Sequence, residues 1–302
     1  PFGPPKAFKK IINRIYKNLS TDETGEEYVK AYENATNSIS RFHAVLSKQI
    51  VLGNGSGELL SLLLRVLKPR RAIIPSPSDS MYFDVCRRSG CESVPLLLSR
   101  EKEFDLDADD LILKAQGVDM IILANPNNPT SRIIDKGNLK KILDYCQEKG
   151  IYLVIDEAYA DFVSADISAV KYVSHYANII IIKTLENYFS LSGLRFAYTV
   201  SCEGLSELMR SNQVRGTVNY FSLIAFEALL KDTKHIKKTK NWLISEPKRF
   251  FHIVSTLGGV TAYKPHANYI FIELEQIPSA TLCERLAAKV ADVKNGNKAC
   301  GQ

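Results

Sequence analysis

Short runs of β-branched and other apolar residues alternate along this chain with longer amphipathic stretches. The pattern predicts strands over residues 72–75, 119–124, 151–155 and 179–183, and helices such as 79–90 and 138–149 between them. These runs are apolar throughout, which is typical of strands that are buried on both faces. We therefore expect an α/β fold, with a mostly parallel sheet sandwiched by helices.

The last third of the chain has a different pattern, in which long helices dominate. Helices are predicted over 204–212, 219–231 and 233–257, followed by strands near 260 and over 268–274 and a helix from 279. We expect residues 22–230 to form a large domain. Residues 1–21 and 231–302 would form an N-terminal arm and a smaller α+β domain.

Composition narrows the class of function. The formal net charge of +6 over 302 residues favours anionic small molecules but is too small to indicate nucleic acid binding. No apolar run is long enough to cross a bilayer, and residues 1–20 carry Lys and Arg without the apolar block of a signal peptide. The six cysteines form no C-x-x-C pair and the five histidines are scattered, so we expect reduced thiols, a cytoplasmic location and no metal site.

Four polar motifs lie at or just beyond the predicted strands. Ligands of open parallel sheets bind beyond the carboxyl ends of the strands, so these motifs are candidates for one binding site. In chain order they are residues 53–58, 125–130, 156–159 and 192–195.

Each motif has a functional and a purely structural interpretation. The glycine-rich turn before Ser56 and Gly57 can present backbone N–H groups to a phosphate, or it can be a turn with Ser56 as helix N-cap. Asn128 lies either in a ligand crevice or in a rigid proline turn. Asp156 can pair with a protonated pyridine nitrogen or cap the next turn, and Arg195 suits a phosphate. The four together describe a pyridoxal-phosphate pocket.

The order of these motifs resembles fold type I of the pyridoxal-phosphate enzymes, the class I/II aminotransferase family. The likeness covers nearly the whole chain, including residues 1–5 and 267–269, and is greatest to histidinol-phosphate aminotransferases and threonine-phosphate decarboxylases. It implies a transferase or lyase of histidine or cobalamin biosynthesis that acts on small amino or phosphate compounds. It also implies a two-fold pocket, and hence a homodimer or a heterodimer with a paralogue.

The resemblance also implies roles for individual residues. Asp156 would pair with the pyridine nitrogen of the cofactor, while Asn128 and Tyr159 would contact its ring hydroxyl. The phosphate group would be held by three residues: Ser56, the backbone of Gly57, and Arg195.

The chain departs from the family pattern at the catalytic lysine. That lysine stands eight positions before the arginine, and 195 − 8 gives position 187, which is Asn187. Glu186 replaces a small hydroxyl residue, Asp79 replaces the aromatic ring that stacks on the cofactor, and Lys183 lies four residues too early. Asparagine neither forms a Schiff base nor moves a proton, so we expect standard covalent catalysis to be impaired.

Further departures lie elsewhere in the chain. Residues 19–22 stand where a tyrosine reaching the neighbouring subunit is expected, and Ser131 and Ala197 replace glycines. The sequence ends at Gln302, before the segment that in the family supplies the arginine gripping the substrate carboxylate, so we expect a fragment or a truncated copy, shortened at both ends. Three hypotheses remain open: an active aminotransferase or decarboxylase, a protein that binds its ligand without turnover, and a non-catalytic partner subunit.

Overall fold

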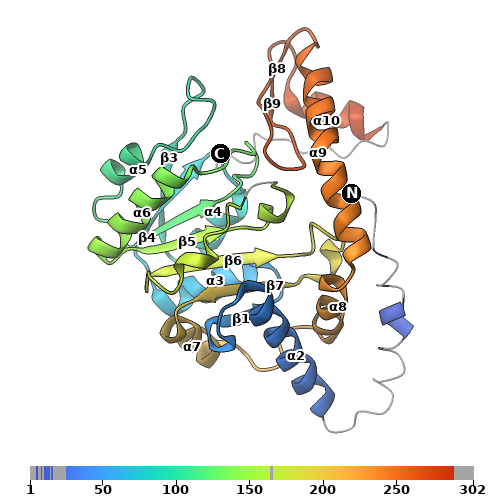
Figure 1. The fold of residues 1–302 in the computed structure, drawn as a ribbon. Coiled ribbons are helices and arrows are strands. Elements are labelled where there is room, and N and C mark those ends of the chain that lie inside the picture. Colours follow the sequence, from blue (N-terminus) through green and yellow to red (C-terminus); the bar gives the residue numbers. More distant parts are fainter. Residues whose placement is uncertain are drawn as a thin grey trace.

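The computed structural model describes residues 25–163 and 166–288, together with residues 5, 8, 10–13 and 15. Its centre is a seven-stranded sheet in the order β1-β7-β6-β5-β4-β2-β3 (Figure 1). The strands are β1 (Ile50–Gly53), β2 (Arg71–Ser76), β3 (Glu92–Leu97), β4 (Met120–Ala124), β5 (Tyr152–Asp156), β6 (Ile179–Thr184) and β7 (Ala197–Ser201). Neighbours are parallel except that β7 runs antiparallel to β1 and β6. The predicted mostly parallel sheet is confirmed.

Helices cover both faces of this sheet, and successive strand residues supply the two cores. Ile180 and Ile182 of β6 pack toward one face, whereas Ile179 and Ile181 pack toward the other. The first face, called here the α3 face, carries α3 (Ser56–Leu67), α4 (Ser80–Arg88) and α7 (Glu203–Asn212). The second, the α6 face, carries α2 (Glu26–His43), α5 (Ala108–Lys114), α6 (Lys136–Lys149) and α8 (Tyr220–Leu230).

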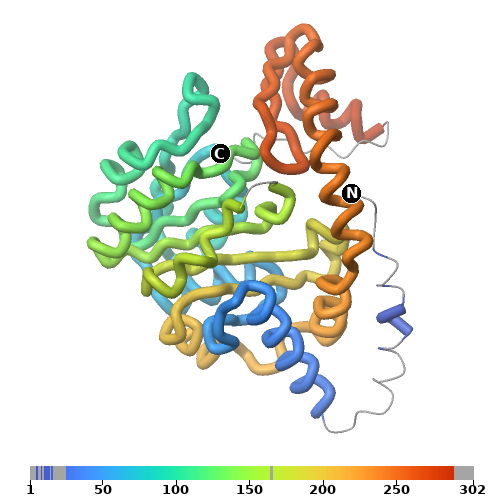
Figure 2. The backbone as a smooth tube through the Cα atoms, in the orientation of Figure 1, coloured from blue at the N-terminus to red at the C-terminus, as the bar shows by residue number. Residues whose placement is uncertain are grey.

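A smaller unit follows α8. The long helix α9 (Thr233–Ser255) leads away from the sheet to the antiparallel pair β8 (Val260–Ala262) and β9 (Ile272–Leu274), and α10 (Ser279–Ala287) lies beside them (Figure 2). The strand β9 begins at Ile272, whereas the sequence predicted a start at 268. Four 3-10 helices complete the described secondary structure: η1 (Ser47–Gln49), η2 (Ala160–Phe162), η3 (Val170–Tyr172) and η4 (Ser192–Leu194).

Neither a membrane-spanning helix nor a cluster of metal ligands is found in the part of the chain that the structure describes. Among the helices of the described residues, none is long and apolar enough to span a membrane. Within the same residues, no group of three or more His, Cys, Asp or Glu side chains is placed to hold a metal ion.

Candidate functional site

The sheet brings the four sequence motifs to one edge. Gly53 ends β1 and Thr184 ends β6, and both pair with Ala197, the first residue of the antiparallel strand β7. Because β7 runs the other way, the turn that carries Arg195 lies beside the carboxyl ends of its neighbours. Asp156 ends β5 at this same edge, where residues 125–130 follow β4.

Asp156 is a buried carboxylate that lies on the α3 face. Its Oδ2 accepts a hydrogen bond from the hydroxyl of Tyr82 on α4 at 3.0 Å, and its Oδ1 accepts one from the backbone N–H of Ala158 at 2.9 Å. Burial raises the pKa of Asp156 from 3.8 to about 6, although these two hydrogen bonds favour the charged form. A charged carboxylate in this position is costly, and a cationic partner would relieve the cost.

This burial predicts a stability effect that depends on pH. The folded protein holds the Asp156 proton more tightly than the unfolded chain does, so the charge costs stability progressively as pH rises from about 4 to about 6. We expect Asp156→Asn to exceed the wild type in free energy of unfolding by about 2 to 3 kcal/mol at pH 7, and to match it near pH 4. Urea unfolding at several pH values measures the difference. A gap between the two proteins that does not change with pH would contradict this account.

The start of α3 and Arg195 form a cradle at the edge. Gly55 precedes the helix with a φ of 91°, and a Cβ at this position would overlap the guanidinium of Arg195. Helix α3 begins at Ser56 and its N-cap is Gly55, so the interpretation of Ser56 as the N-cap is wrong. Arg195 lies directly against the N-terminus of α3, where partial positive charge attracts anions.

Helix α8 holds the turn that presents Arg195. The carbonyl oxygen of Leu194 accepts hydrogen bonds from Asn219 Nδ2 at 2.8 Å and from Ser222 Oγ at 2.5 Å. Arg195 itself has a φ of 52°, a left-handed conformation that these contacts stabilise.

Glu186 occupies the other side of Arg195. Its Oε1 lies 3.0 Å from Nη1 of Arg195, and its Oε2 accepts a hydrogen bond from the backbone N–H of Phe196 at 3.2 Å. Burial raises the pKa of the Glu186 carboxyl, and the charge of Arg195 opposes this effect. The arginine expected to hold a phosphate therefore already holds a carboxylate of its own chain.

Asn128 and Asp79 are hydrogen-bonded to each other. Asn128 Nδ2 donates to Asp79 Oδ2 at 2.8 Å, and Asp79 Oδ1 caps α4 by accepting from the backbone of Met81 at 2.9 Å. The ring of Tyr159 packs edge-on against Tyr269, with the ring centroids 4.9 Å apart. Burial raises the pKa of Tyr159, and nearby carboxylates add to the effect, so its hydroxyl stays protonated near neutral pH.

Lys183 faces away from these residues. It follows Ile182 on β6, and strand alternation places its side chain on the α6 face, opposite to Asp156. There its Nζ lies 3.1 Å from Glu157 and 3.9 Å from Asp161, and only 2% of the side chain is exposed. Burial by itself lowers the pKa of Lys183, but the carboxylates of Asp161 and Glu157 outweigh burial and raise it.

A neutral histidine lies near Lys183 on the α6 face of the sheet. His43 of α2 and the hydroxyl of Tyr198 form a hydrogen bond of 2.8 Å. Burial and the nearby charge of Lys183 lower the pKa of His43 to about 3, so the ring is uncharged at neutral pH.

Asn187 lies in the turn after β6. It is half-buried, and its carbonyl oxygen accepts a hydrogen bond from the backbone of Ser190 at 3.2 Å. The structure therefore keeps residue 187 close to the edge where Asp156 and Arg195 lie, and it keeps Lys183 on the opposite face of the sheet.

Two other departures from the family pattern can be placed. Ser131 has a φ of 59°, which favours glycine, but its Oγ accepts hydrogen bonds from the backbones of His266 and Ala267 at 3.0 and 2.9 Å. This side chain thus ties the loop after β4 to the smaller unit. Ala197 is buried at the start of β7. Residues 1–4, 19–22 and 289–302 lie outside the described residues.

The sequence did not single out Tyr82 as a site residue. Its hydroxyl donates to Asp156, and its ring is buried between α4 and the sheet. The sequence did contain a signal for Tyr82. It stands three residues after Asp79, the N-cap of α4, and so lies in the first turn of a helix that packs on the sheet.

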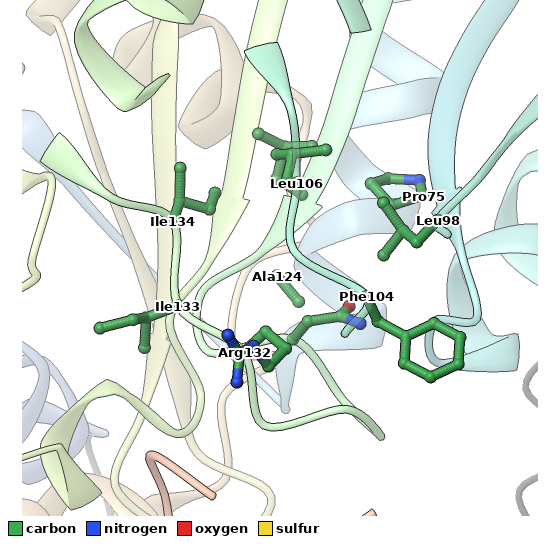
Figure 3. A pocket seen from close by; sticks show the side chains of 10 residues that line it. Pro75, Leu98, Phe104, Leu106, Ala124, Arg132, Ile133 and Ile134 are labelled. Carbon is green, nitrogen blue, oxygen red and sulfur yellow. The ribbon is translucent and has the colours of Figure 1, made fainter. Parts of the chain in front are cut away.

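A small hollow lies farther along the edge, beside the ends of β2 and β4 (Figure 3). Apolar side chains line most of it, among them Leu98 and Phe104, and Arg132 is the charged residue of the lining. Arg132 already pairs with Asp105 at 2.5 Å and with Glu103 at 3.2 Å. The hollow is therefore a poor place for a further anion.

The residues at this edge of the sheet suit the binding of a pyridoxal ring, but they do not supply the amine that would bind it covalently. Asp156 is a buried acid that lacks a cationic partner among its hydrogen bonds, and a protonated ring nitrogen would supply one. Position 55, where a Cβ would overlap Arg195, shows that the cradle is closely built. Asn187, in contrast, has no amine with which to bind covalently.

Comparison with known proteins identifies the family. The family model described as aminotransferase class I and II matches residues 4–291. Threonine-phosphate decarboxylase of Salmonella typhimurium is 29% identical over an alignment of 280 residues that covers 91% of this chain and 75% of that protein. Histidinol-phosphate aminotransferase of Ruminiclostridium cellulolyticum is 27% identical over an alignment of 294 residues that covers 93% of this chain and 78% of that protein.

Solved structures agree. The histidinol-phosphate aminotransferase from Clostridium acetobutylicum superposes with a TM-score of 0.86 at 28% identity, covering 96% of this chain and 85% of that one. The aspartate aminotransferase of Thermus thermophilus shares the fold, with a TM-score of 0.85 at 17% identity, 99% of this chain and 82% of that one. The chain therefore belongs to the aminotransferase class I and II family.

Proposed function

We propose that this chain binds a vitamin-B6-type ring in the site at the sheet edge without forming a covalent bond to it. The observation that carries the proposal is that the side chains of Asp156, at the end of β5, and Lys183, near the end of β6, lie on opposite faces of the sheet. The acid Asp156 faces the same side of the sheet as the α3 cradle, whereas the nearby Lys183 is buried in an ion pair on the other side.

Individual residues would then have separate roles. Asp156 would hold the proton on the ring nitrogen, and Tyr159 and Asn128 would approach the ring hydroxyl. The cradle of Ser56, Gly57 and Arg195 would receive the tail of the ligand. When bound, pyridoxal phosphate supplies an electron sink for bonds made to an amino acid.

Turnover is expected to be weak or absent. In this proposal Asn187 takes the lysine position, and its amide has no ionisable proton to exchange near neutral pH. Asp79, in the place proposed for a stacking ring, offers a carboxylate that is already bonded to Asn128. A binding protein that retains the family scaffold accounts for both features.

The alternative is an active enzyme, and the relatives named threonine-phosphate decarboxylase and histidinol-phosphate aminotransferase favour it. The two alternatives differ in turnover. Sustained conversion of threonine phosphate or histidinol phosphate by the purified chain with added pyridoxal phosphate would establish the enzyme and rule out a purely binding role.

Equilibrium dialysis tests the binding proposal directly. Wild-type protein should bind about one equivalent of pyridoxal per chain, and Asp156→Asn should weaken this binding roughly ten-fold or more, because a charge-assisted hydrogen bond to the ring nitrogen is lost. Asp144→Asn is the matched control, since Asp144 is a half-exposed carboxylate on α6. Equal binding by wild type and Asp156→Asn would contradict the proposed site.

We also propose that the chain assembles as a dimer, with itself or with a paralogue. Helix α2 and the turn after it expose Val29, Phe42 and Leu46, each more than half accessible. Apolar side chains so exposed are candidates for burial against a partner. Sedimentation that gives the mass of a monomer at micromolar concentration would count against this proposal.

A further inference from the structure

The ion pair between Glu186 and Arg195 stands where the family resemblance expects a phosphate. Glu186 is held from two sides, by the guanidinium at 3.0 Å and by the backbone N–H of Phe196 at 3.2 Å. The glutamate is only 8% exposed, whereas 54% of the arginine side chain is accessible. The carboxylate is thus the fixed partner of the pair.

A second carboxylate near the cradle adds to the negative charge that a phosphate would meet there. Glu58 lies in the first turn of α3, and its Oε2 accepts a hydrogen bond from the backbone of Asn54 at 3.3 Å. The carboxylates of Glu58 and Glu186 therefore both lie near the start of α3, where the guanidinium of Arg195 also lies. A doubly charged phosphate that entered here would meet them at short range.

Displacing Glu186 would not remove the difficulty. If a phosphate took the guanidinium, the Glu186 carboxylate would stay buried and lose its ion pair. An uncompensated buried charge is strongly destabilising, so the chain resists this exchange. An uncharged hydroxymethyl tail, in contrast, can lie against the pair without breaking it.

We propose that Glu186 is a specificity-determining residue that fills the anion position of the cradle, so that the site takes ring ligands with an uncharged tail and gives no advantage to a phosphate. This inference rests on the proposed function, since it names the ligand class of the same site. It concerns the tail of the ligand and is independent of the ring contact made by Asp156.

Calorimetric titration with pyridoxal, pyridoxal phosphate and inorganic phosphate tests the inference. Wild-type protein should bind pyridoxal phosphate no more tightly than pyridoxal. Glu186→Ser should raise the affinity for pyridoxal phosphate on the order of ten-fold or more, because a charge-assisted contact with Arg195 becomes available, and should leave pyridoxal affinity within about two-fold. Glu186→Gln is the second variant, since its amide oxygen can still accept from Phe196 and so maintain the fold.

Glu92→Gln serves as the charge-matched control. Glu92 pairs with Arg71 on an exposed surface of β2 and β3, at 3.1 Å, so its removal changes net charge without touching the cradle. This variant should titrate like the wild type. An equal gain in Glu92→Gln would assign the effect to net charge and overturn the inference.

Inorganic phosphate separates this inference from the proposed function. Phosphate binding gained by Glu186→Ser and absent in the wild type supports the inference even if no pyridoxal binds, a result that would overturn only the proposed function. Wild-type protein that binds pyridoxal phosphate ten-fold more tightly than pyridoxal would overturn the inference and leave the proposed function standing. Unchanged phosphate affinity in both Glu186 variants would also overturn it.

Discussion

Replacing Lys183 by methionine should lower the free energy of unfolding by about 3 to 5 kcal/mol, the usual cost of breaking a buried ion pair from one side. The ammonium lies 3.1 Å from Glu157, whose side chain is fully buried, and Asp161 lies 3.9 Å away. Methionine fills similar volume but leaves both carboxylates without their cation. Urea denaturation of both proteins at pH 7 measures the loss, with the same dependence of unfolding free energy on urea concentration fitted to both.

Lys171→Met provides the matched comparison. Lys171 pairs with Asp166 at 3.0 Å, but both side chains are exposed, so its loss should change the free energy of unfolding by less than about 1 kcal/mol. Lys183→Met should also bind pyridoxal as the wild type does, since its side chain lies on the α6 face. If Lys183→Met lost less than about 1 kcal/mol, the buried ion pair would not have the structural role that we assign to it.

Asn187→Lys should change covalent binding from none to about one equivalent of cofactor per chain. Asn187 is half-buried in the turn after β6, at the edge that carries Asp156 and Arg195. An amine there can bond covalently to pyridoxal or pyridoxal phosphate at saturating concentration. Reduction with borohydride followed by intact-mass analysis detects the added group. Turnover should remain low, because we expect Asp79, whose carboxylate is bonded to Asn128, in the place of a stacking ring.

Two double variants locate the added group. Lys183→Met in the Asn187→Lys background should keep the adduct, which shows that the new lysine carries it. Asp156→Ala in the same background should reduce the adduct, because the ring nitrogen loses its partner. If Asn187→Lys gave no adduct at saturating cofactor, position 187 would not lie at the proposed site.

Much of the large domain could be predicted from local pattern. The apolar runs that form β2, β4, β5 and β6 appear within one or two residues of their predicted bounds, because strands buried on both faces have little polar content. The predicted start of the short strand β9 is four residues too early. The register of β8 and β9 begins at the pair Ala262 and Ile272, and beyond it the carbonyl oxygen of Phe271 accepts one hydrogen bond from the backbone of Tyr263 at 3.0 Å.

The arrangement inside the site was less accessible to sequence reasoning. The opposite orientation of Lys183 follows from strand alternation once β6 is known to include it. Its partners, the buried Glu157 and the partly exposed Asp161, depend on how β5 packs beside β6. The pairing of Glu186 with Arg195 depends on the left-handed turn at Arg195. Such a turn is set by tertiary contacts with α8 and not by local propensity.

Reduction of the wild-type protein in the presence of ligand tests the central claim most directly. The protein is saturated with pyridoxal or pyridoxal phosphate, binding is verified by dialysis, and the complex is treated with borohydride before intact-mass and peptide analysis. A bound ligand held by Asp156 but facing Asn187 predicts about one equivalent by dialysis and no stoichiometric adduct by mass. A stoichiometric adduct mapped to Lys183 would contradict the account, because that side chain would have to reach the α3 face from its buried ion pair on the α6 face.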